Sequence, residues 1–141
     1  MGLGLRIRTE QRGLAAIEFA IITPLLLTFV FGIIAYGVFF GAAHSVQQLA
    51  ANSARAAMGG LDNEERQALV SEYVTASLAE GGLLAPDHLD VVVQASEEDT
   101  SSIIVSVSYD ASELPVWNLY QGLPLPERMI TRKSVIRVGG Y

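Results

Sequence analysis

The chain has 141 residues, a net charge of −6 and no cysteine, and half of its residues are hydrophobic. This length leaves room for one ordinary domain. The lack of cysteine excludes disulfides and thiolate metal sites. The acidic balance argues against nucleic-acid binding, which normally requires a basic surface.

The first 13 residues form a short basic segment. Arg6, Arg8 and Arg12 outweigh Glu10, which leaves the segment with a charge of +2. A basic segment directly before an apolar run stays in the cytoplasm, so the C-terminal part is expected on the other side of the membrane. The apolar run is too long for a secretory signal peptide. Two interpretations are open: a signal anchor that is kept, and a leader that is removed on the cytoplasmic side.

Residues 14–43 predict a single transmembrane helix. The stretch from Phe19 to Ala43 holds 25 residues without a charge, which at ~1.5 Å per residue gives roughly 38 Å, more than the ~30 Å hydrocarbon core. Glu18 is the one charge inside the apolar run, about one turn from its start. A carboxylate at this depth is costly and indicates a function, unless it simply lies in the inner headgroup layer.

Proline and glycine residues interrupt this predicted span. Pro24 removes one backbone hydrogen bond and is expected to kink or loosen the helix. Gly32, Gly37 and Gly41 leave notches for another helix, and the last two fit the G-x-x-x-G pattern. Because glycine is common in membrane helices, self-packing and a merely tolerated glycine are both open. Tyr36 is interpreted as an interfacial anchor.

The start of the apolar run resembles a known processing site. Gly13 followed by Leu14-Ala15-Ala16-Ile17-Glu18-Phe19 is similar to type IV prepilins, in which a membrane peptidase cuts after the glycine and the fifth mature residue is glutamate. With the basic leader and Pro24, the segment up to about Gly60 resembles the TadE-like minor pseudopilins of the Tad (tight adherence) pilus. Ala54-Arg55-Ala56-Ala57 resembles a segment that often follows the span in that family. Phe19 stands where Tad major pilins usually have tyrosine, which favours the minor subunits.

The resemblance implies a function in assembly. A prepilin peptidase would cut between Gly13 and Leu14, and we expect an extended backbone at this glycine because glycine resists the helix. Glu18 would then pair with the new amine of a neighbouring subunit, since an ion pair in low dielectric offsets part of the desolvation cost. The implied partners are the peptidase, other pilin and pseudopilin subunits, the assembly platform of the bacterial inner membrane and the lipid bilayer, with no cofactor and no nucleic acid.

A helical pattern continues beyond the predicted span. Apolar and small residues recur at helical spacing up to Ala57, so one helix from about Leu14 to Met58 is predicted, with Gly59-Gly60 as its end. The members of this face are Val46, Leu49, Ala50, Ser53, Ala54 and Ala57. Asp62 and Glu65 predict the capped start of a second helix that Gly81-Gly82 closes.

The last part of the chain predicts a small antiparallel sheet. Alternating residues indicate strands over 89–95, 102–109 and 130–138, the first two joined by a polar turn. Residues 111–129 are rich in proline and large apolar side chains, so they are either packed on the head or form a contact surface. The basic residues of the third strand either meet an acidic patch of a neighbouring subunit or discourage aggregation at an edge.

No catalytic or metal-binding pattern is present in the sequence. His44 and His88 have no nucleophile or metal ligand nearby in sequence, and Glu97-Glu98-Asp99 lacks the glycine and spacing of a calcium loop. The sequence therefore predicts a non-enzymatic α+β protein in three parts: a leader over 1–13, a transmembrane helix over 14–43, and an extracytoplasmic head over 44–141. The expected function is that of a minor pseudopilin in pilus assembly, adherence or biofilm formation. The alternative is an unprocessed, signal-anchored protein whose periplasmic head binds another protein.

Overall fold

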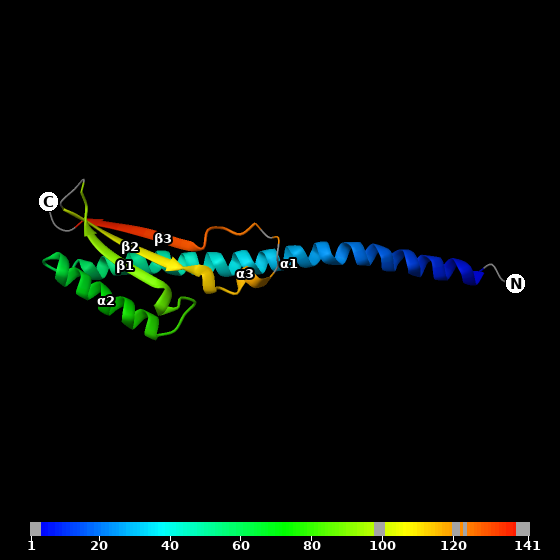
Figure 1. Ribbon diagram of the computed structural model, residues 1–141, viewed down its shortest axis with the longest axis horizontal. Coiled ribbons are helices and arrows are strands. Elements are labelled where there is room, and N and C mark those ends of the chain that lie inside the picture. The colour runs from blue at the N-terminus through cyan, green and yellow to red at the C-terminus, as the bar shows by residue number, and fades with distance from the viewer. Residues whose placement is uncertain (1–3, 98–100, 120–121, 123, 138–141) are drawn as a thin grey trace.

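The computed structural model describes residues 4–97, 101–119, 122 and 124–137, with side chains from Gly13 onward. It consists of one very long helix with a small α+β head along its C-terminal half (Figure 1). The elements are α1 (Gly4–Ala57), α2 (Asn63–Ala79), η1 (Pro86–His88), β1 (Leu89–Ala95), β2 (Ser102–Asp110), η2 (Ala111–Glu113), α3 (Val116–Leu119) and β3 (Met129–Arg137). The predicted fold class, with its second helix and three-stranded antiparallel sheet, is confirmed.

Helix α1 ends where the two glycines predicted its end. The amides of Met58, Gly59 and Gly60 each donate to a carbonyl three residues back, at 3.2 Å, which closes the last turn. At Gly60 a Cβ atom would lie 2.7 Å from the backbone nitrogen of Arg66, so only glycine allows this close approach. The chain therefore reverses here, and α2 returns alongside α1.

Helix α2 begins with the predicted cap. The Asp62 carboxylate accepts a hydrogen bond of 2.8 Å from the amide of Glu65, and the Glu65 carboxylate accepts one of 2.8 Å from the amide of Leu61. These reciprocal bonds satisfy donors that the first helical turn leaves unpaired. At the other end Gly81 adopts a left-handed backbone with φ of 85°, as a helix-terminating glycine does.

The sheet has β2 at its centre. Strands β1 and β3 both pair with β2 in antiparallel register, for example Val93 with Val105 and Val105 with Ser134. Both helices lie on one face of the sheet, with α1 contacting β2 and β3 and α2 contacting β1. The inward side chains of β2 are all buried, as their alternation predicted: Ile103, Val105, Val107 and Tyr109.

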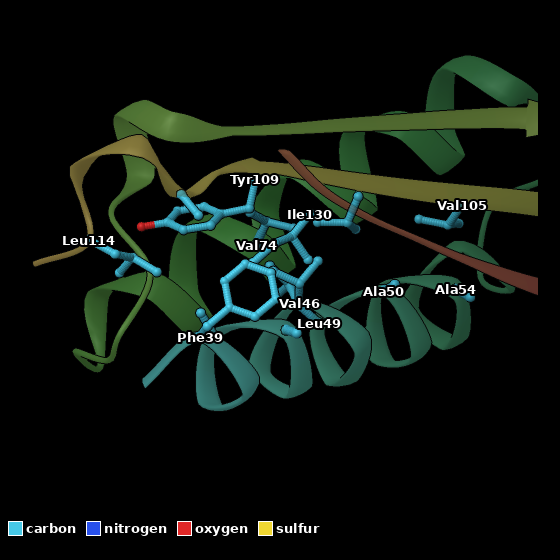
Figure 2. Packing of buried hydrophobic residues seen from close by; sticks show 14 of the residues in the cluster. Phe39, Val46, Leu49, Ala50, Ala54, Val74, Val105, Tyr109, Leu114 and Ile130 are labelled. Atoms are coloured by element: carbon cyan, nitrogen blue, oxygen red, sulfur yellow. The ribbon is translucent and has the colours of Figure 1, made fainter. Parts of the chain in front are cut away.

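The core lies between this sheet and the outer half of α1. Figure 2 shows Tyr109 and Ile130 of the sheet above Phe39, Val46 and Leu49 of the helix. All six members of the predicted helical face are buried, but the buried stripe begins earlier, at Ala35. The head therefore packs on part of the stretch that the sequence assigned to the membrane, where it buries Ala35, Phe39, Ala42 and Ala43.

The proline-rich segment between β2 and β3 packs on the head in its described part. Ala111, Leu114 and Val116 are buried, and the indole nitrogen of Trp117 donates to the carbonyl of Ala111. The Arg128 guanidinium lies 5.2 Å from the centre of the Trp117 ring, a cation–π contact. This supports packing over a free contact surface. Residues 120, 121 and 123 lie outside the described part of the chain.

Candidate functional site

The inner half of α1 is a bare apolar rod. From Gly13 to Ile34 its side chains are exposed or half-buried, and its large apolar residues point to all sides without protein cover. Among the described residues, α1 is the one helix long and apolar enough to cross a membrane. The 22 residues over 13–34 would extend about 33 Å at ~1.5 Å per residue, close to the thickness of the hydrocarbon core.

Gly13 and Glu18 lie at the start of this rod. Both are exposed, and a Cβ atom on Gly13 would meet nothing within 4 Å. The expectation of an extended backbone at Gly13 is wrong, because α1 already begins at Gly4 and runs through this residue. The helix forms through the leader because Gly13 is its single glycine after Gly4, and one such residue costs only about 1 kcal/mol.

Glu18 is the single charge on the exposed rod. It lies four residues after Leu14, so the two side chains share one face of the helix. The residues whose side chains are described around it offer no cation for a salt bridge, since 13–34 hold no lysine, arginine or histidine. The neighbouring Phe19 is 70% exposed and points away from any protein contact. The arrangement offers an accessible carboxylate on an otherwise apolar surface.

Pro24 does not interrupt α1. The helix continues through it from Gly4 to Ala57 as one element. Two threonine hydroxyls donate to carbonyls one turn back: Thr23 to Phe19 at 2.7 Å, and Thr28 to Pro24 at 2.8 Å. Hydroxyl bonds of this kind are tolerated in an apolar helix because they satisfy the side chain locally. The effect of Pro24 is therefore local: the helix lacks one backbone hydrogen bond at this residue and is otherwise continuous.

The three glycines of the span lie in different surroundings. A Cβ atom on Gly41 would contact the Leu83 side chain of the head at 3.4 Å, whereas one on Gly37 would meet nothing within 4 Å. Gly32 lines a shallow apolar hollow with Thr28, Phe29, Ile33 and Tyr36. The G-x-x-x-G notch is thus half occupied by the chain's own head. Its free half, at Gly37, is the part that another helix can still approach.

Tyr36 marks the boundary between the bare rod and the head. Its hydroxyl donates to the carbonyl of Pro124, which ties the helix to the segment before β3. The sequence analysis did not predict this contact, nor the burial of Ala35, Phe39, Ala42 and Ala43. Ala35, Phe39 and Ala42 continue the helical stripe that was recognised from Val46 onward, but the spacing of a stripe does not indicate whether lipid or protein covers it.

The head shows no competing chemistry in its described part. No group of three or more potential metal ligands occurs among the described residues. Asp110 accepts a hydrogen bond of 2.9 Å from the amide of Ser112, and this bonding lowers the pKa of its carboxyl group. Because Asp110 caps η2, the shift has a structural cause. His44 is exposed, and its imidazole forms a hydrogen bond of 2.9 Å with the side-chain amide of Gln48, as expected for an ordinary polar residue.

Comparison with known families identifies the segment that begins at this site. Residues 13–55 match the family described as TadE-like protein. The chain carries a TadE-like segment. No curated protein and no solved structure matches the chain. The match covers the bare rod and most of the head-bearing half of α1.

Proposed function

We propose that this protein is a minor pseudopilin of a Tad-type pilus, which a prepilin peptidase cuts after Gly13. The mature protein would act in pilus assembly and, through the pilus, in adherence or biofilm formation. One observation carries the proposal: the TadE-like match starts at Gly13 itself, where the bare apolar rod begins and five residues before its single charge. A lipid anchor alone requires neither this glycine nor this glutamate.

Cleavage would change the electrostatics at the start of the rod. It would remove the charges of the leader and create an ammonium group on Leu14. Glu18 lies one turn farther on and on the same face, so each mature chain would carry an amine and a carboxylate as one polar spot. Two chains side by side could exchange these partners, and such pairs offset part of their desolvation cost in lipid. This supports Glu18 as the residue that sets the register of neighbouring subunits.

The structure also supports a shorter membrane span than the sequence suggested. Residues 14–34 would lie in lipid, and the head would begin at Ala35, at the outer surface. Tyr36 would lie at the interface, where tyrosine is favoured because its ring is apolar and its hydroxyl polar. The leader arginines would lie in the cytoplasm and the head outside it.

The processing step can be tested by intact mass and N-terminal sequencing of the protein purified from membranes. We expect a chain that starts at Leu14. Gly13→Ala should leave the leader in place, and because a Cβ atom there contacts nothing, the fold should not change. Gly37→Ala is the matched control, since it also fills open space and should be processed normally. An intact leader in the unmodified protein would instead favour the signal-anchored alternative, with a periplasmic head that binds another protein.

The role of Glu18 needs a separate measurement. Glu18→Ala should still give a chain starting at Leu14, but its amount in the sheared pilus fraction should fall roughly tenfold, which corresponds to about 1.4 kcal/mol. Ile22→Ala, on the same bare rod, serves as the control for loss of side-chain volume. Equal incorporation of Glu18→Ala and the unmodified protein would refute the register role while leaving the processing claim intact.

A further inference from the structure

The head carries opposite charges on its two flanks. Residues 44–127 hold thirteen acidic side chains and two basic ones, whereas residues 128–137 hold four basic side chains and no acidic one. Strand β3 contains three of these four cations. The sheet order separates α2 from β3, because α2 contacts β1 at one edge of the sheet and β3 forms the other edge.

Strand β3 forms the basic flank. Among the described residues it pairs only with β2, so its other edge has no neighbouring strand. Arg132 and Lys133 are both exposed and point to opposite faces of the strand. Arg132 donates to the backbone carbonyl of Thr131 at 2.9 Å. Neither cation has a carboxylate within ion-pair distance among the described residues, so both are available to a partner.

Helix α2 closes the opposite edge of the sheet. The Gln67 side chain donates to the Val91 carbonyl at 3.2 Å and accepts from the Val93 amide at 3.1 Å. One side-chain amide thus bonds the outer edge of β1 as a further strand would, which protects that edge. The two edges of the sheet differ: one is covered by α2, and the other, at β3, is open.

The outward face of α2 is acidic. Glu64 and Glu72 are exposed, and Glu72 lies on the side opposite the buried Val70 and Val74. The single cation of α2, Arg66, is half-buried and donates to the Gly60 carbonyl at 3.1 Å. The residues around Glu72 on this face are exposed alanines, Ala68, Ala76 and Ala79, which would allow close approach.

We propose that the basic β3 flank of one copy of this chain packs against the acidic α2 flank of a second copy. Both elements run alongside α1 on opposite sides of the head, so parallel chains can make this contact side by side (Figure 1). A contact between different flanks is heterologous and can repeat from copy to copy, as in a filament. A symmetric contact between two β3 edges would bring Arg132 and Lys133 against the same cations of the other copy, which is unfavourable.

This contact deepens the proposed role in assembly and rests on it for the parallel, membrane-anchored arrangement. The chain has no cysteine, so single cysteines report contacts without background. Ala76→Cys on α2 and Val135→Cys on β3 replace exposed side chains. The two full-length variants, with different tags, are co-expressed in membranes and treated with a short bismaleimide. We expect the mixed pair to cross-link at least fivefold more than either variant alone.

Charge reversal tests what holds the contact. Lys133→Glu in the Val135→Cys copy should lower the cross-linked yield about fivefold, and Glu72→Lys in the Ala76→Cys copy should restore it. Arg55→Glu is the matched control, because it reverses an exposed cation that belongs to α1 and to neither α2 nor β3, and it should change nothing. Adding salt should weaken the contact in the same direction.

Other results would overturn the proposal. Equal cross-linking of Val135→Cys with itself would indicate a symmetric β3 contact. A mixed cross-link insensitive to Lys133→Glu would show that charge does not hold it, and cross-links only to a different protein would rule out a second copy as the occupant. N-terminal sequencing of the same samples separates the two proposals. If the chains start at Leu14 but do not cross-link, only the contact is refuted. If the chains cross-link but keep their leaders, only the processing is refuted.

Discussion

The two halves of α1 form one continuous helix but have very different surroundings. From residue 13 to 34 the helix carries large apolar side chains on every side, and none is fully buried. From residue 35 to 57 one stripe is buried by the head, while the opposite side carries polar residues such as His44, Gln48 and Arg55. The first pattern is typical of a helix in lipid and the second of a helix in a protein core.

The difference lies in side-chain size as much as in polarity. The buried stripe of the outer half is built mainly from alanines, including Ala35, Ala42, Ala50, Ala54 and Ala57. Small side chains let the sheet lie close to the helix, and a close-packed interior then has little space for additions. The inner half has no such constraint. The same substitution can therefore be made once in each half of α1, and the difference in the head's stability between the two variants measures how differently the halves are packed.

The largest effect is expected for a pair of phenylalanines. Phe39 is 8% exposed and packs in the core, whereas Phe29 is 63% exposed on the bare rod. Phe39→Ala should lower the free energy of unfolding of the head by about 3 kcal/mol, since it leaves a cavity. Phe29→Ala should leave it unchanged. Guanidinium titration of the detergent-solubilised chain, followed by the fluorescence of the single tryptophan, Trp117, provides the measurement. Equal losses from the two variants would contradict the division of α1 at residue 35.

A pair of alanines tests the close packing by adding side-chain volume instead of removing it. Ala54 is fully buried and Ala20 is exposed. Ala54→Leu should destabilise the head by about 2 kcal/mol, because the added carbons have to displace the sheet. Ala20→Leu adds the same volume on the bare rod and should have no effect in the same titration. An Ala54→Leu protein as stable as the unmodified chain would mean that the sheet does not lie tightly on the helix.

The sequence predicted local structure well, because local chemistry decides it. The Asp62 cap, the glycine ends and the alternation in 102–109 predicted elements close to those observed, and the polar turn after residue 95 predicted the antiparallel pairing of β1 with β2. The head begins to cover α1 at residue 35, earlier than the sequence suggested. An apolar stripe has the same spacing whether lipid or a sheet covers it, so periodicity alone could not distinguish them.

The candidate site rests on a different kind of inference and stays a prediction. Gly13 and Glu18 were identified by their types and spacing, and the TadE-like match covers both. Their backbone was not predictable: the sequence suggested an extended Gly13, and the helix runs through it. The packing of Trp117 under Arg128 was also missed, because two residues so far apart in a proline-rich segment have no periodicity to relate them.

The smallest effect is expected for the two glycines at the boundary. Gly41→Leu has to displace the Leu83 side chain, which lies 3.4 Å from where a Cβ atom on Gly41 would be, and should destabilise the head by about 1 kcal/mol. Leu83 is 44% exposed and can move, which keeps this cost low. Gly37→Leu fills open space and should leave the head's stability unchanged in the same titration. Gly37→Leu would still fill the free half of the notch. If this variant lowers cross-linking between the transmembrane helices of two chains while the head stays equally stable, Gly37 contacts another helix.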